Sequence, residues 1–544
     1  MNHRITYFSV TCVALLLFPM VACAWEPNAK DLDDAIGSGD FGTYSTNVTK
    51  WLNQKTPATV TEDSLKLLLK DAVFVHTLDQ YQFISKCGAD KLGAFAKADK
   101  GNQAFLTWLM KDTRVMDLYL EAGGVPSGDG CIPTLKFWCK VFHADPDSKG
   151  GICLKIAIAT AIMHPVPFTD ERTPRITQPY EGRYLYYKKA HQDGDLLPSF
   201  DHLSVWECQK VVEGMGAPPE DLTWVRQLVR TWRPDLIKDN RIVKIVSEVR
   251  YGHSPIPIVD MASVLDAGGI CGRRSYFGRK TCAAFGIPAI GILQPRHAAL
   301  ACKTGDTWQV EYGASWWAST CEGGPDGEEF VAEAVARSHA AEFSQSEHLK
   351  WLASALTAKD TAKAITAVAV KLVPRSTDPK AMVHDSDTKS EMEANGVSKT
   401  TSATKSSLVP QEVSRVDAGT LHINADNFDK MANVMVYDSY PDGTGKQVNF
   451  QKNLDASWVD YTLDAPKAGI YSLVLKLAAP NRNQVLNVTV GTGSVAAIHV
   501  PNTRGLWGMT SAIDIKLEKG KQTFRIAAPL QRGIAVKWIE LKQK

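Results

Sequence analysis

Apolar residues recur at three- and four-residue intervals through most of the first half of the chain. This spacing places them on one face of a helix, and it is clear in segments 62–76, 103–120 and 222–232. Clusters of Gly, Pro and Ser, such as the one at 123–128, separate such segments. The pattern therefore predicts a mainly helical region over residues 25–249.

The pattern changes after this region. A helix-like stretch follows Cys271, and three short runs of β-type residues come next, at 290–293, 298–302 and 308–312. Helical periodicity then returns. These features predict an α+β unit with trailing helices over residues 250–374.

Residues 375–414 and 415–544 differ sharply in composition. The first stretch is rich in Ser, Thr, Lys and Asp and poor in aromatic residues, so it cannot bury enough apolar surface to fold alone and is predicted to be a linker. The second alternates apolar and polar residues between Gly, Pro and Asn turns, which predicts an antiparallel β-sandwich. A multi-domain fold is also expected from the length of 544 residues, which exceeds what one hydrophobic core supports.

The first 24 residues have the features of a secretion signal. An apolar run at 10–20 follows Arg4 and is too short to span a bilayer, and Ala22, Cys23 and Ala24 form a small-x-small cleavage pattern. Cleavage there would leave Trp25 as the first mature residue. Lipidation of Cys23 is the alternative. Both predict an exported protein, secreted or periplasmic, and no later segment is apolar for long enough to be a transmembrane helix.

Charge and composition exclude several partner classes. The chain has 61 Lys and Arg against 59 Asp and Glu, a formal net charge of +2. Nucleic acid is not expected as a partner, because binding it needs a concentrated basic surface. The chain has no CxxC pair and no Cys/His run at zinc spacing, so neither a metal nor a cofactor is expected.

Nine cysteines remain once the signal is removed. In an oxidising compartment, an odd number predicts four disulfides and one free thiol. The alternative is that several of them are buried thiols. The nine residues are Cys87, Cys131, Cys139, Cys153, Cys208, Cys271, Cys282, Cys302 and Cys321.

The best candidate chemistry lies at Cys271, within the Gly-Gly-Ile-Cys-Gly sequence of residues 268–272. Amide dipoles on the first turn of a helix stabilise a thiolate, and the two glycines allow a sharp strand-to-helix turn. His297, on the second predicted strand, can take the thiol proton. Glu311, on the third, can orient the imidazole. The set predicts a cysteine nucleophile, a histidine base and an orienting acid.

The order of these elements resembles the transglutaminase-like superfamily, which has a papain-like cysteine site. Residues 268–272 are similar to its helix start and 286–289 (Gly-Ile-Pro-Ala) to its next turn. His297 is similar to its histidine, and 308–311 to its Trp-x-x-Asp strand, with Glu311 in place of Asp. The resemblance implies an acyl-thioester enzyme. Transfer to water would make it a peptidase or amidase, and transfer to an amine a transglutaminase.

Two alternatives stay open at this site. Asp306 is a second candidate for the orienting acid. A disulfide from Cys271 to Cys282 or Cys302 would remove the nucleophile. The chain would then be a non-catalytic surface carbohydrate-binding or adhesion protein with a degenerate scaffold.

The C-terminal region resembles carbohydrate-binding modules of the galactose-binding-like jelly-roll type, families 6 and 35. The matching stretches are 423–429, 458–473, 500–507 and 535–541. The resemblance implies binding of polysaccharide, peptidoglycan or glycoprotein. Because sugar rings stack on flat aromatic side chains, Trp507 is the expected platform and Tyr440 a second one. Together, the sequence predicts a cysteine enzyme for a peptide or amide substrate, targeted to glycan by its sandwich.

Overall fold

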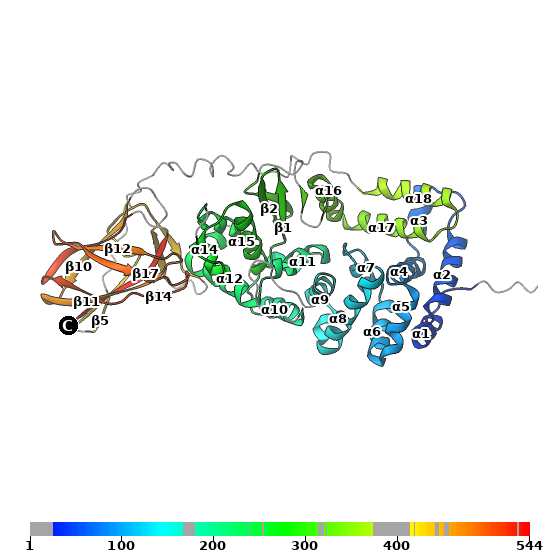
Figure 1. The fold of residues 1–544 in the computed structure, drawn as a ribbon, viewed down its shortest axis with the longest axis horizontal. Coiled ribbons are helices and arrows are strands. Elements are labelled where there is room, and N and C mark those ends of the chain that lie inside the picture. Colours follow the sequence, from blue (N-terminus) through cyan, green and yellow to red (C-terminus); the bar gives the residue numbers. More distant parts are fainter. Residues whose placement is uncertain are drawn as a thin grey trace, which may run out of the picture.

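The computed structural model of the protein describes residues 25–166, 180–238, 240–252, 255–313, 320–321, 324–373, 414–417, 419–440, 445–450, 456–529 and 533–544. The predicted signal peptide, and residues 375–413 of the predicted linker, lie outside these ranges. Helices make up the N-terminal half and antiparallel strands the C-terminal part, which forms one end of an elongated molecule (Figure 1).

Short helices fill the N-terminal half, as the apolar periodicity predicts. They are α1 (Ala29–Ser38), α2 (Phe41–Lys55), α3 (Glu62–Leu68), α4 (Ala72–Cys87), α5 (Ala89–Ala98), α6 (Lys100–Lys111), α7 (Thr113–Leu120), α8 (Cys131–Ala144), α9 (Gly151–Met163), α10 (Tyr180–Gln192), α11 (Val205–Val212), α12 (Pro219–Trp232), α13 (Asp235–Lys238) and α14 (Met261–Ala267). Short 3₁₀ turns join some of them, including η4 (Gly214–Gly216) and η5 (Ile242–Glu248).

Two of the predicted helical segments are each split by an aspartate cap. Asp71 accepts hydrogen bonds from the backbone N–H groups of Val73 and Phe74, and α4 starts there instead of continuing α3. Asp112 caps α7 through the N–H of Val115 in the same way. An aspartate that bonds to the backbone ahead of it favours a new helix start over a helix interior.

The middle of the chain forms the α+β unit. Helix α15 (Cys271–Ala284) precedes an antiparallel sheet with strand order β3-β2-β1-β4. Its strands are β1 (Ala289–Gln294), β2 (His297–Thr304), β3 (Thr307–Glu311) and β4 (Thr320–Cys321), and the helices α16 (Gly327–Ser338), α17 (Ala340–Ala355) and α18 (Lys359–Leu372) follow. The three predicted strand runs are confirmed as β1, β2 and β3.

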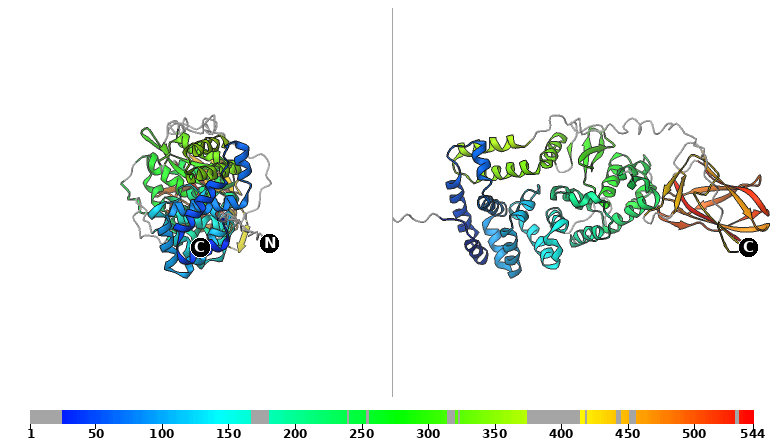
Figure 2. Two further views of the ribbon diagram at one scale, coloured as in Figure 1. Left: turned by 90° about the vertical axis from the view of Figure 1, so that its right-hand side faces the viewer. Right: turned by 180° about the vertical axis from the view of Figure 1, so that it is seen from behind.

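Helices α17 and α18 return along the N-terminal helices rather than staying beside the sheet (Figures 1 and 2). The Asn53 side chain bonds to the backbone O of Ala355 and the backbone N–H of Thr357. Buried residues of the helical region, α15, α17 and α18 form one hydrophobic core. The predicted helical region and the predicted α+β unit therefore share a core.

The C-terminal part is an antiparallel sandwich with its own core. One sheet has the order β13-β12-β16-β10-β7, and the other includes β14-β11-β17-β6-β5. The strands are β5 (Ser414–Asp417), β6 (Thr420–Asn424), β7 (Lys430–Ala432), β8 (Val434–Asp438), β9 (Lys446–Phe450), β10 (Ser457–Ala465), β11 (Gly469–Ala478), β12 (Gln484–Val490), β13 (Ala496–Val500), β14 (Gly508–Met509), β15 (Ile513–Leu517), β16 (Gly520–Ala528) and β17 (Ile534–Gln543). Of the described helices, none has both the length and the hydropathy needed to cross a bilayer.

The cysteine count over-predicted the disulfides. Cys87 and Cys131 are bonded, and the other seven cysteines of the described residues are thiols. Five of these seven are buried, where cysteine behaves as a small apolar residue. Cys282 and Cys302 contact each other as a hydrogen-bonded pair, which together with burial raises the pKa of the Cys282 thiol well above its usual value.

A buried histidine makes the fold sensitive to acid. His164, at the end of α9, donates from Nε2 to the backbone O of Val212, and burial lowers its pKa to about 3. The ring stays neutral in the folded protein, whereas the unfolded chain takes up a proton below about pH 6.5. We therefore expect the free energy of unfolding to fall by about 2 kcal/mol between pH 6.5 and pH 5 because of His164.

Urea unfolding of the wild type and of His164→Gln at pH 7 and pH 5 measures this cost. The glutamine amide can donate to the same carbonyl without titrating. The variant should lose about 2 kcal/mol less than the wild type on acidification. An equal loss in both proteins would contradict the assignment.

Candidate functional site

Cys271 begins α15, and the two glycines before it make the turn as predicted. Gly268 ends α14 with φ +69°, and a Cβ on it would lie 2.6 Å from the backbone O of Arg250. A side chain is therefore excluded at this position. The turn joins two helices, α14 and α15, rather than a strand and a helix as expected. Ile270 precedes α15 in extended conformation, and no side chain caps the helix.

The Cys271 thiol is unbridged and half-buried. Its two alternative disulfide partners, Cys282 and Cys302, contact each other instead. Cys271 therefore combines three properties of a reactive cysteine: a free thiol, partial exposure and a place on the first turn of a helix of 14 residues.

His297 lies at the start of β2, close to the first turn of α15. A Cβ on Gly272, the residue after Cys271, would be 4.0 Å from the Cβ of Ala298, the residue after His297. The structure thus brings Cys271 and His297 to one junction. In the described residues there is no hydrogen bond between the Cys271 thiol and the His297 ring. The ring nitrogen Nε2 bonds instead to the backbone O of Tyr312.

A carbonyl oxygen can only accept, so Nε2 of His297 carries the hydrogen in the neutral ring. The other nitrogen, Nδ1, is left with its lone pair. Tyr312 can present its carbonyl because it leaves β3 with φ +59°, and its ring lies near the Arg274 guanidinium, 5.3 Å away. The sequence contains no signal for this backbone contact.

Glu311 is not joined to His297. Its carboxylate forms a buried ion pair with Lys244 of η5 at 2.8 Å. In the antiparallel pairing of β2 with β3, Glu311 lies opposite Leu300, whose side chain packs against α15 at Gly278. Asp306 lies in the turn at the far end of β2, roughly 23 Å along the strand from His297. Neither candidate acid is the hydrogen-bond partner of the imidazole.

A small cavity of about 90 Å³ opens beside the first turn of α15. Four of its lining residues, Gly272, Ser275, Tyr276 and Arg279, follow the 3.6-residue period of the helix and form one stripe. Arg279 pairs with Glu213, and Ser275 donates to the backbone O of Ala299 at 2.6 Å. The rest of the lining consists of Met215, Gly291, Ile292, Leu293, Ala298 and Ala299.

Sequence reasoning missed this stripe, although its helical spacing from Gly272 is visible in the sequence. The cavity lies next to the candidate nucleophile, and most of its lining is apolar. Its volume suits a small side chain rather than a large ring.

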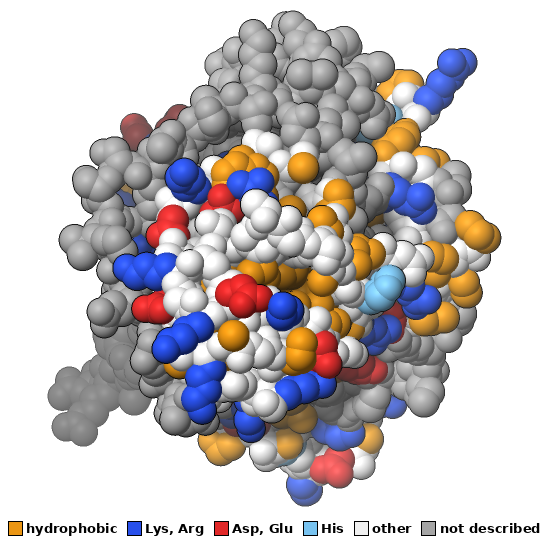
Figure 3. Space-filling view, turned by 90° about the vertical axis from the view of Figure 1, so that its left-hand side faces the viewer, with side chains coloured by type: hydrophobic (Ala, Val, Ile, Leu, Met, Phe, Trp, Pro, Cys, Tyr) orange, Lys and Arg blue, Asp and Glu red, His pale blue; other side chains and the backbone are white. Residues whose placement is uncertain are grey.

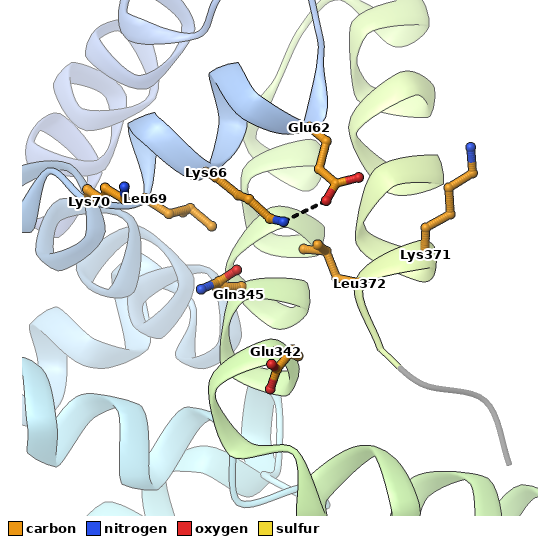
Figure 4. A pocket seen from close by; sticks show the side chains of 8 residues that line it. All are labelled: Glu62, Lys66, Leu69, Lys70, Glu342, Gln345, Lys371 and Leu372. Carbon is orange, nitrogen blue, oxygen red and sulfur yellow. Dashed lines mark hydrogen bonds and ion pairs between the residues drawn. The ribbon is translucent and has the colours of Figure 1, made fainter.

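A larger hollow, of about 410 Å³, lies at the opposite end of the helical part between α3, α17 and α18 (Figure 4). Its walls are charged and solvent-open, with Lys66 bonded to Glu62 at 2.6 Å. It contains neither a cysteine nor a histidine, so it offers no nucleophile.

The predicted sugar platforms are at an interface within the chain. Trp507 is partly buried and packs against the helical core, together with Ala478 and Ala535 of the sandwich. The Arg230 guanidinium of α12 lies 5.0 Å from the centre of the Tyr440 ring. The structure therefore places both predicted rings in loops where the sandwich meets the helical part.

Close packing and hydrogen bonds both hold the sandwich against the helical part. Gly505 approaches Leu228 so closely that a Cβ on it would be 2.0 Å from Cδ1 of that leucine. The Asn449 side chain donates to the backbone O of Trp232 at 2.7 Å. Asp266 accepts from Arg482 at 2.9 Å.

The opposite end of the sandwich faces away from the helical part. There, basic side chains are spread over the face, with fewer acidic ones and scattered hydrophobic ones among them (Figure 3). The sandwich therefore exposes the end drawn in Figure 3 to solvent, and the end that carries Trp507 contacts the helical part.

No family model matches the chain, and no curated protein does. Among solved structures it is similar to the C-terminal family 6 carbohydrate-binding module of LamC, a marine laminarinase from Zobellia galactanivorans. That module is 20% identical over 23% of this chain and 99% of its own, with a TM-score of 0.21. The module CBM6cm-2 of Cellvibrio mixtus lichenase 5A, solved with cellotriose, is 21% identical over 23% and 96%, with a TM-score of 0.20.

A family 35 module from Clostridium thermocellum is 18% identical over 23% of this chain and all of its own, with a TM-score of 0.20. These neighbours belong to the two families that the C-terminal residues resemble. Identities and TM-scores this low indicate nothing about what this chain binds.

Proposed function

We propose that this chain is an exported thiol-dependent acyl-transfer enzyme, a peptidase or amidase or a transglutaminase-like acyltransferase, with Cys271 as its nucleophile. The observation that carries the proposal is an unbridged, half-buried thiol on the uncapped first turn of α15, at the junction where His297 begins β2. The helix amides favour the thiolate, and the adjacent cavity can receive the side chain of an acyl group.

In the proposed reaction, Nδ1 of His297 takes the Cys271 proton and the sulfur attacks the acyl carbon of a peptide or amide. The imidazolium then returns the proton to the nitrogen of the leaving amine as the C–N bond breaks. An acyl thioester remains on Cys271. Water or a second amine, deprotonated by the same ring, attacks this thioester and restores the thiol.

In this proposal the Tyr312 carbonyl, rather than Glu311, orients the His297 ring. Because Nε2 donates to that carbonyl, the ring is held with Nδ1 as its basic nitrogen. A neutral carbonyl stabilises an imidazolium less than a carboxylate does.

Selective alkylation tests the proposal. Iodoacetamide at pH 7, followed by peptide mass mapping, should label Cys271 first. Burial raises the pKa of Cys208 and Cys321 to about 12 and that of Cys139 to about 11, so these thiols should remain unmodified. The Cys271→Ser variant should lose the fast modification. If another cysteine reacts first, the alternative of a non-catalytic surface carbohydrate-binding or adhesion protein is favoured.

Glu311→Gln is expected to affect stability more than reactivity. The substitution leaves the half-buried Lys244 without its carboxylate, which should cost about 2 kcal/mol of unfolding free energy. The alkylation rate of Cys271 should change by less than about threefold, because Glu311 does not contact His297. Denaturant unfolding and alkylation kinetics measure the two effects. A large loss of reactivity with unchanged stability would return Glu311 to the orienting role.

We further propose that the sandwich binds polysaccharide, peptidoglycan or glycoprotein. Trp507 and Tyr440 are its aromatic candidates. In this arrangement Trp507 packs against the helical core, and Arg230 of α12 lies near the Tyr440 ring. Stacking of a sugar on Trp507 therefore requires the sandwich to move away from the helical part. This makes glycan binding and inter-domain docking competing states.

A further inference from the structure

Three helices far apart in sequence bring two carboxylates and an imidazole together inside the helical part. Asp79 of α4, Asp117 of α7 and His348 of α17 place one ligand atom each within 4.8 Å of one another. The His348 Nε2 is 2.9 Å from Oδ1 of Asp79 and 3.5 Å from Oδ1 of Asp117. This cluster lies outside the Cys271 site and takes no part in the proposed reaction.

The histidine is oriented as a metal ligand would be. Its Nδ1 lies 2.8 Å from the backbone O of Ser344, and a carbonyl only accepts, so Nδ1 carries a hydrogen. Nε2 is therefore the nitrogen that faces the two carboxylates. A hydrogen bond from one ring nitrogen to a backbone carbonyl is the usual support of a metal-bound imidazole.

The buried carboxylates of this cluster lack hydrogen-bond partners for some of their oxygens among the described residues. Asp79 is fully buried, and its Oδ2 has no hydrogen-bond partner among the described residues. Oε1 of neighbouring Glu121 is also buried without such a partner among these residues. A carboxylate oxygen removed from water normally has a donor or a cation beside it. The unpaired Asp79 oxygen therefore points to a missing positive partner.

A divalent cation in place of the Nε2 proton would bring one positive charge more to the two carboxylates than a protonated His348 does. The Asp117 side chain is 30% exposed although its Oδ1 is buried, so this residue connects the cluster to the surface.

We propose that Asp79, Asp117 and His348 bind a divalent first-row transition-metal ion such as Zn²⁺ or Mn²⁺. One imidazole with two carboxylates is a ligand set that suits these ions, and water can complete the coordination. Binding replaces the proton on Nε2, which is released to solvent. The ion would link α17 to α4 and α7, and so join the returning helices to the N-terminal ones.

Metal titration of the full chain, first dialysed against a chelator, tests the site. Mn²⁺ and Co²⁺ are the probes. Each should bind with one equivalent and raise the Tm by roughly 5 °C at a large excess over Kd. Bound Co²⁺ should show no sulfur-to-metal charge-transfer band, which separates this site from the free cysteines.

The Asp117→Asn variant alters the most exposed ligand and should still fold. It should weaken Mn²⁺ binding at least about tenfold and abolish most of the Tm rise. His191→Gln is the matched control, because His191 pairs with Asp201 on the surface and with no second carboxylate of the described residues. Its binding should equal that of the wild type. Absence of binding, or equal binding by Asp117→Asn, would mean that the cluster is an internal ion pair only.

Discussion

Replacing Cys271 by Ala is expected to abolish acyl transfer, with a loss of at least about a thousandfold in rate. The substitution removes the sulfur that forms the thioester, and no other described thiol lies on the first turn of α15. The activated ester p-nitrophenyl acetate measures the step without knowledge of the natural substrate. A burst of p-nitrophenolate reports acylation, and the slower phase reports attack by water. Added glycine ethyl ester should accelerate the slow phase if an amine is the better acceptor.

Cys153→Ala is the matched control, because Cys153 is the other half-buried thiol and burial raises its pKa. Its burst should equal that of the wild type. His297→Ala should keep the thiol but slow the burst at least about tenfold, since no base then takes the proton. If the burst survives in Cys271→Ala, the proposed nucleophile is wrong.

Replacing Gly505 by Ala is expected to release the sandwich from α12. Gly505 has φ +77°, and its Cβ would be 2.0 Å from Leu228 Cδ1 and 3.5 Å from the Pro480 side chain. We expect a cost of about 3 kcal/mol, part from backbone strain and part from the clash. Because the sandwich has its own core, it should stay folded and move away. Small-angle scattering should show a larger radius of gyration.

Gly491→Ala is the control for this change. Gly491 also has positive φ, at +54°, but nothing lies within 4 Å of its Cβ position. It should cost about 1 kcal/mol and leave the radius unchanged. If glycan stacks on Trp507, a polysaccharide pull-down should strengthen in Gly505→Ala and fail in Gly505→Ala with Trp507→Ala. An unchanged radius in Gly505→Ala would contradict the docking account.

Much of the local structure follows from patterns in the sequence. Strands β1, β2 and β3 were predicted to within a residue or two, because side-chain alternation is a property of a few neighbouring residues. The glycine pair before Cys271 was recognised for a similar reason, since a Cβ cannot fit where the backbone turns so sharply. The helix breaks at Asp71 and Asp112 were missed, although aspartate caps are equally local signals.

The side-chain contacts of the site residues could not be predicted from neighbouring residues in the sequence. Glu311 was a reasonable orienting acid by spacing, yet packing of η5 on α15 brings Lys244 to its carboxylate. Likewise, an odd cysteine count does not reveal that Cys282 contacts Cys302. Each of these pairings depends on how elements distant in the chain meet.

The sequence alone thus predicts most helices and strands and the helix that begins at Cys271, because these depend on neighbouring residues. Packing in three dimensions brings Asp79, Asp117 and His348 together and places Trp507 against the helical core. The physical reason is that burial and charge compensation act between side chains close in space, and more than two hundred positions in the sequence separate His348 from both aspartates.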